Sequence, residues 1–132
     1  MVDRAEMLST IDLLYARRVA SDKAGVAELL APGATFRIAG DSLPIPGVSQ
    51  GEGLANRKIA DLIDAFVFHE VERLDALIDG DRIAVRSRAR ISPVGGEAIE
   101  AELYDLWTFS PDGKIASGLQ FGDAALIARL LA

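Results

Sequence analysis

The spacing of apolar residues changes once along this chain, and that change constrains the fold more than any other feature. Up to about residue 66 they recur every three or four positions, which is typical of amphipathic helices. From 68 to 121 they alternate with polar residues, which is typical of strands. Turn sequences at 79–81, 93–96 and 110–113 divide this second part, and such short turns join antiparallel neighbours. The sequence therefore predicts helices first and an antiparallel meander after them.

The first half is expected to hold three helices and one strand. They are a helix over 3–20, a second helix capped at 21–22 and ended by Pro32-Gly33, a strand over 34–38 and a helix over 52–66. On the first helix, Arg17 and Arg18 are assigned to the polar side. The segment 40–47 carries two prolines and two glycines, so it reads as a loop, and its Asp41 could close over a pocket.

The second half is expected to hold four long strands and a last helix. The strands are predicted over 68–78, 82–91, 97–109 and 114–121, and Asp123 can cap the final helix. The helices would then cover one side of a curved sheet, an α+β fold with a hollow at one end. A chain of 132 residues, 50% of them hydrophobic, is expected to form a single domain over 1–132.

Charge alternation indicates the register of the central hairpin. Over 82–91 the odd positions are apolar or small, and four arginines occupy even positions. Pairing Arg90 with Glu100 matches opposite charges and keeps the apolar positions of both strands on one face. This register places Asp105 on the inner face, opposite Val85. The arginine stripe is interpreted as a set of solvated pairs rather than as an anion site.

A carboxylate facing an apolar hollow is the leading candidate for chemistry. Burial would raise the pKa of Asp105, so it could donate or accept a proton, although a purely structural role fits the sequence equally well. Gln120 is its expected partner, whereas a one-residue bulge would turn Leu119 and Phe121 inward instead. The side chains expected around the pocket are Tyr15, Phe36, Val85, Ser87, Trp107 and Gln120.

The only histidine, His69, is the second candidate for catalysis. Histidine side chains commonly take up and release protons near neutral pH, and this one stands at the start of a strand, from which it could reach the pocket mouth, although a structural or surface role is favoured. With one His and no Cys, neither a metal nor any cofactor is expected.

The expected partners are few. A formal charge of -6 disfavours nucleic acid and anionic membranes, and no apolar run approaches the roughly 20 residues of a membrane span. Without a signal-peptide pattern, the cytoplasm is the expected location. A small apolar molecule is the expected ligand. Tyr104 and Leu106, with Leu119 and Phe121, make the outer face of the sheet too apolar for water, which favours a homodimer through that face.

Three local sequences carry a family resemblance. They are LLAPGATF at 29–36, DGDRIAV at 79–85, and YDLWTF at 104–109 followed by DGKI at 112–115. In this order and spacing they resemble the nuclear transport factor 2-like superfamily, in its SnoaL-like polyketide-cyclase and ketosteroid-isomerase branch. The resemblance covers nearly the whole chain. It implies a cone-shaped, curved, mostly antiparallel sheet packed on the N-terminal helices, and a homodimer.

The ketosteroid-isomerase pattern is only partly present. Asp105 falls on the protonated Asp of those enzymes, but Ile38 stands where their base belongs and Tyr15 is one position away from their Tyr. Steroid isomerisation is therefore not expected, unless Asp41 or His69 replaces the base.

Two other chemistries of the superfamily differ in what they require. Limonene-epoxide hydrolases use an Asp-Arg-Asp set, whose positions here hold Val85, Ser87 and Gln120. SnoaL-like cyclases need only one acid/base Asp. The resemblance therefore implies a cofactor-free isomerase, cyclase or hydratase acting through Asp105 on a small apolar carbonyl compound. The alternative is a non-catalytic domain of the same fold that binds an apolar ligand or only dimerises.

Overall fold

The computed structural model describes residues 2–39, 48 and 51–122. Its elements are α1 (Arg4–Val19), α2 (Lys23–Ala27), β1 (Leu30–Ile38), β2 (Gly53–Leu54), α3 (Ala55–Ala65), β3 (Phe66–Asp79), β4 (Arg82–Pro93), β5 (Ile99–Phe109) and β6 (Ile115–Phe121). The loop expected at 40–47 and the helix expected after Asp123 lie outside the described residues. Among the helices of the described part, none is long and apolar enough to cross a membrane.

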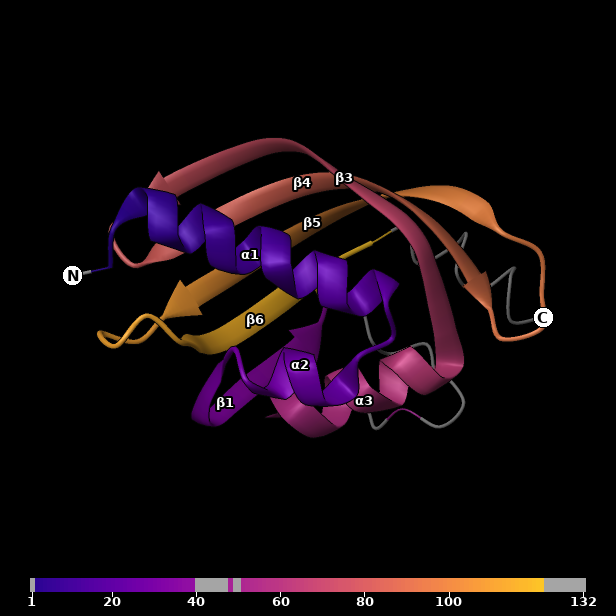
Figure 1. The fold of residues 1–132 in the computed structure, drawn as a ribbon, viewed down its shortest axis with the longest axis horizontal. Coiled ribbons are helices and arrows are strands. Elements are labelled where there is room, and N and C mark those ends of the chain that lie inside the picture. The colour runs from indigo at the N-terminus through magenta and orange to yellow at the C-terminus, as the bar shows by residue number, and fades with distance from the viewer. Residues whose placement is uncertain (1, 40–47, 49–50, 123–132) are drawn as a thin grey trace.

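The six strands form one open, curved sheet in the order β2-β1-β6-β5-β4-β3. Only β1 and β6 run parallel, and the other neighbours are antiparallel. The three helices lie on the concave side, with α1 across the hollow and α2 and α3 beside β1 (Figure 1). The register of β3 shifts at His69 and again at Leu74, and bulges of this kind bend a strand around what it covers. The α+β fold expected from the sequence is confirmed.

The boundary between α2 and β1 differs from expectation. The helix ends at Ala27, and β1 begins at Leu30, so Pro32 and Gly33 lie inside the strand instead of ending the helix. The pairing of β1 with β6 shifts register between Leu30 and Thr35, and Gly33 has a φ of 76° there. Both residues fit because this stretch of the strand is irregular. Pro32 has no backbone N–H to donate to a neighbouring strand, and Gly33 can adopt the positive φ without steric strain.

The register of the central hairpin is as expected. Arg90 pairs with Glu100 and Val85 pairs with Asp105, so the odd positions of β4 and β5 face the core. The ion pairs of the outer face join Arg86 to Glu102 (2.8 Å) and Arg88 to Glu72 (2.9 Å). Both pairs are largely exposed, as expected for the arginine stripe. Their partners differ from the register, because Arg88 bonds to Glu72 on β3 instead of Glu102, and no ion pair within the described residues joins Arg90 to Glu100.

The buried side of α1 differs from expectation at one charged residue. The buried residues of this helix are Met7, Ile11, Leu14, Tyr15 and Arg18. Arg18 is 6% exposed, whereas Val19, which the apolar pattern places inside, is 37% exposed. Arg18 lies three and four positions after Tyr15 and Leu14, so helix geometry places it in their stripe despite its charge.

Candidate functional site

Asp105 lies at the centre of the sheet, on its inner face. Its neighbours across the strands are Val85 on β4 and Gln120 on β6, and it is only 1% exposed. Burial raises the pKa of Asp105 to about 6, against the opposing effects of Tyr15, Gln120 and the positive charge of Arg18. A carboxyl group with such a pKa can both release and take up a proton near neutral pH.

A short hydrogen-bonded chain holds this carboxyl group. The Tyr15 hydroxyl donates to Oδ2 of Asp105, and Nε1 of Trp107 donates to the Tyr15 oxygen at 3.3 Å. Burial, together with the nearby Asp105, raises the pKa of Tyr15 well above its ordinary value, so its hydroxyl stays protonated and remains a donor. Tyr15 thus contacts Asp105 directly, although it stands one position away from the isomerase pattern.

The other carboxyl oxygen is the less constrained one. Oδ1 of Asp105 is buried and has no hydrogen bond of regular geometry within the described residues. The Gln120 side chain lies close enough to lower the pKa of Asp105. It faces inward because β6 is irregular near Ala116, which lets Ile115 and Gln120 share a buried face while Phe121 is 49% exposed. Of the two orientations left open by the sequence, the structure has Gln120 inside, and here a bulge turns Gln120 inward, contrary to the expectation that a bulge would turn it outward.

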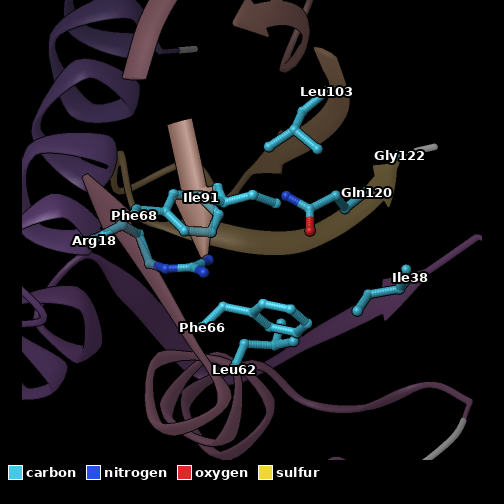
Figure 2. A pocket seen from close by; sticks show the side chains of 9 residues that line it. All are labelled: Arg18, Ile38, Leu62, Phe66, Phe68, Ile91, Leu103, Gln120 and Gly122. Atoms are coloured by element: carbon cyan, nitrogen blue, oxygen red, sulfur yellow. The ribbon is translucent and has the colours of Figure 1, made fainter. Parts of the chain in front are cut away.

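A small cavity lies next to this buried group. Its volume is about 40 Å³, room for a few water molecules. The residues that line it are Arg18, Ile38, Leu62, Phe66, Phe68, Ile91, Leu103, Gln120 and Gly122. Figure 2 shows the polar ends of Arg18 and Gln120 projecting from opposite sides into a space otherwise bounded by apolar side chains. Asp105 does not line the cavity, but Gln120 contacts both.

Arg18 is the site residue that sequence reasoning missed. Its guanidinium carbon lies 4.1 Å from the centre of the Phe68 ring, a cation–π contact. Burial lowers the pKa of Arg18 to about 10, while the charge of Asp105 opposes that change. The group therefore stays cationic at neutral pH. The available signal was positional, because the spacing of Leu14, Tyr15 and Arg18 continues the buried stripe of α1.

Most of the expected pocket residues instead build the floor of the hollow. Phe36, Val85 and Trp107 belong to the apolar core, and the rings of Phe36 and Trp107 stack with centroids 5.7 Å apart. Both rings pack over Gly118, where a Cβ atom would lie 2.8 Å from Cδ1 of Phe36. Ser87 is buried, with its hydroxyl unpaired within the described part of the chain. None of these residues is among those that line the cavity.

His69 lies apart from the cavity. It is exposed, occupies an irregular position of β3, and its Nε2 is 2.8 Å from the hydroxyl oxygen of Ser92. It is not a lining residue. The described residues also contain no group of three His, Cys, Asp or Glu side chains able to hold a metal ion.

Comparisons with known proteins agree with the fold. The sequence model of the SnoaL-like domain family matches residues 11–118. An NTF2-like protein of unknown function from Burkholderia pseudomallei is 20% identical, with a TM-score of 0.77 over 96% of this chain and 98% of that one. TerC, co-crystallised with polyporic acid, is 16% identical, with a TM-score of 0.77 over 96% of this chain and 98% of TerC. SalBIII, an epoxide hydrolase/cyclase-like enzyme of pyran ring formation in salinomycin, is 20% identical, with a TM-score of 0.71 over 95% and 96%. A search of curated sequences finds no match.

Proposed function

This chain belongs to the SnoaL-like domain family, and from that membership and the geometry around Asp105 we propose that it is a cofactor-free acid/base enzyme. Its reaction would be an isomerisation, cyclisation or hydration of a small, mostly apolar compound that carries a carbonyl group. Such reactions need a proton moved between a carbon or oxygen of the substrate and a well-placed acid or base.

The observation that carries the proposal is the buried carboxyl group of Asp105. Its pKa of about 6 lies near the operating pH, where a general acid or base works best. Tyr15 fixes Oδ2, so Oδ1 is the oxygen available to a substrate. Buried groups with strongly altered pKa values gather at functional sites, which supports the assignment.

The route from the cavity to Asp105 passes Gln120. Leu62 and Phe66 offer apolar contact to a substrate in the cavity, and Gln120 both lines that space and interacts with the carboxyl group. In the proposed reaction the Gln120 amide turns aside, and the substrate proton meets Oδ1. Tyr15 then holds the carboxyl group in position by its hydrogen bond to Oδ2. Among the relatives, TerC with polyporic acid and the cyclase-like SalBIII are consistent with a small organic substrate.

Proton exchange tests the chemistry without knowledge of the natural substrate. The protein is incubated in D₂O with a panel of small apolar ketones and enones, and loss of the protons next to the carbonyl is followed by ¹H NMR. The wild type should accelerate exchange of at least one compound, and Asp105→Asn should abolish that acceleration. Asp112→Asn is the matched control, since Asp112 is an exposed aspartate in a turn, and it should exchange at the wild-type rate.

Two results would refute the enzymatic proposal. One is exchange that is as fast with Asp105→Asn as with the wild type. The other is a panel in which no compound exchanges faster than in buffer, although some of the compounds bind.

The second result would favour the alternative, a non-catalytic domain that binds an apolar ligand. A specific observation supports that reading as well. Asp105 does not line the cavity, and among the described lining residues only Arg18 and Gln120 are polar. The two functions differ in the effect of Asp105→Asn, since a binding domain would retain its ligand and have no turnover to lose.

We also propose that the chain forms a homodimer through the outer face of β5 and β6. Tyr104 pairs with Phe121 and Leu106 with Leu119, which places four apolar side chains together on the face without helices. Tyr104 and Phe121 are 52% and 49% exposed, and an apolar patch of this kind favours a second copy.

Sedimentation measures this association. Phe121→Lys should shift the protein from dimer to monomer at micromolar concentration. The control is Leu13→Lys on α1, where an apolar side chain is 41% exposed on the opposite side of the sheet. A wild type that sediments as a monomer, or a dimer unaffected by Phe121→Lys, would contradict the proposal.

A further inference from the structure

Arg18 is a buried cation without a counter-ion at close range. It is 6% exposed, and its Nε is buried without a hydrogen-bond acceptor in the described residues. None of the ion pairs found in the described residues includes it. Asp105 acts on Arg18 only as a charge, without a salt bridge, and its Oδ2 already accepts from Tyr15. A buried charge that is left unpaired is unfavourable unless something else compensates it.

The surroundings of Arg18 leave one direction open. The guanidinium lies against the Phe68 ring, and its N–H groups project into the cavity (Figure 2). The opposite side of that space holds the Gln120 amide, which can both donate and accept hydrogen bonds. The rest of the described lining is apolar. At about 40 Å³ the cavity has room for the charged group of a ligand, and a larger hydrocarbon body would have to push these apolar side chains apart.

We propose that Arg18 forms the binding site for a delocalised oxyanion, a carboxylate or an enolate, carried by an otherwise apolar ligand. A planar guanidinium matches two oxygens that share one negative charge, and apolar walls favour a hydrocarbon body next to them. Arg18 is the only cationic residue among the described residues that line the cavity, so a monoanion fits and a phosphate dianion would keep uncompensated charge.

This assignment narrows the proposed substrate from any carbonyl compound to an acidic one, and it rests on the proposed function only for the claim that the ligand is also the substrate. An enolate is what remains after a carbonyl compound has given the proton next to its carbonyl group to a base such as Asp105. Arg18 would therefore stabilise the charge that develops when Asp105 acts as a base. If the protein is not an enzyme, the same site would still bind an acidic apolar ligand.

The test uses three probes of similar size. Benzoate supplies a carboxylate, dimedone supplies an enolate at neutral pH, and benzamide is the neutral counterpart of benzoate. Binding is measured by titration calorimetry and by the ¹⁵N–¹H signal of Arg18 Nε. We expect benzoate or dimedone to bind saturably and move that signal, and benzamide to bind at least about tenfold more weakly. Whichever of the two anions binds identifies the kind of oxyanion.

Variants assign the effect to Arg18. Arg18→Gln should weaken binding of the anion about tenfold or more and leave benzamide unchanged, whereas Arg18→Lys, which keeps the charge, should retain part of the affinity. Arg88→Gln on the exposed face removes the same charge far from the cavity and should bind as the wild type does. If Arg18→Gln does not fold, Arg18→Lys and the comparison of benzoate with benzamide still decide.

Three outcomes would overturn the proposal. Benzamide could bind as tightly as benzoate, Arg18→Gln could bind the anion with wild-type affinity, or neither anion could bind at millimolar concentration. Asp105→Asn separates this result from the enzymatic proposal, because it should lose proton exchange and still bind the anion. Exchange that persists in Asp105→Asn, with the anion still bound, would refute the enzymatic proposal and leave the oxyanion site standing. A wild type that accelerates exchange but does not bind either anion would refute the site alone.

Discussion

The pKa of Asp105 predicts a pH dependence of stability that can be isolated. Below about pH 4 this carboxyl group is protonated in both the folded and the unfolded chain, and its contribution to stability is fully present. As the pH rises from 3.8, the ordinary value, to about 6, the unfolded chain releases the proton while the folded protein still holds it. The free energy of unfolding therefore falls over this window, and the contribution is lost once the pH passes about 6.

The size of this effect follows from the same two values. Each pKa unit corresponds to about 1.4 kcal/mol, so the span from 3.8 to about 6 gives a loss of about 3 kcal/mol. Asp105→Asn removes the titrating group and leaves all others in place. The difference in stability between wild type and Asp105→Asn should therefore decline by about this amount between pH 4 and pH 7.

Urea unfolding followed by the fluorescence of Trp107, the single tryptophan, measures that difference at each pH. The control is Asp112→Asn. The Ser110 hydroxyl lowers the pKa of Asp112, so this residue contributes stability that is lost as the pH falls, below the Asp105 window and with the opposite sign. A difference between wild type and Asp105→Asn that stays constant over the window, or grows with pH, would show that Asp105 is not held in a desolvated site.

Three further variants test the packing around the site and the surface charges. Tyr15→Phe removes the hydrogen-bond donor to Asp105. Urea unfolding should show that the free energy of unfolding falls by about 1–3 kcal/mol at pH 8 and by less at pH 5, where the carboxyl group is largely protonated. Equal losses at both pH values would contradict the assignment. Gly118→Ala forces a methyl group against Trp107, so it should lower the free energy of unfolding by about 1–3 kcal/mol and alter the near-UV circular dichroism spectrum. Wild-type stability would mean that the rings of Trp107 and Phe36 shift freely. Arg88→Gln breaks an exposed ion pair and should leave the melting temperature unchanged; a clear drop would show that the outer face is more tightly coupled than its exposure indicates.

The parts of the fold that the sequence predicts correctly are those where two signals agree. Over β4 and β5 the apolar alternation and the charge pairing point to one register, and a shift by one residue would reverse both. That is why the residue pattern alone places Asp105 on the inner face, opposite Val85. Its position next to Tyr15 cannot be read in the same way, because contacts between a helix and a sheet leave no periodic signal in the sequence.

Local irregularities in the strands limit how much of the remaining structure the sequence can predict. Pro32 and Gly33 are ordinary signals for the end of a helix, and here they form an irregular part of β1 because the strand pairs with β6 on both sides of them. The irregularity near Ala116 has no sequence mark of its own, yet it determines that Gln120 and not Phe121 faces the core. In both cases strand pairing between distant segments decides a local conformation that the local residues leave open.

Arg18 shows how residue type and position can oppose one another in a sequence. A charged residue is normally assigned to the solvated side of a helix, and that assumption outweighs the spacing that puts Arg18 in the buried stripe. The spacing is the better guide because a long side chain can bury its stem and still direct its charged end into a cavity. At Arg18 the helix period and the residue type disagree. A buried charge is unfavourable for folding alone, so such a position in an amphipathic helix is a place to look for a ligand-binding role.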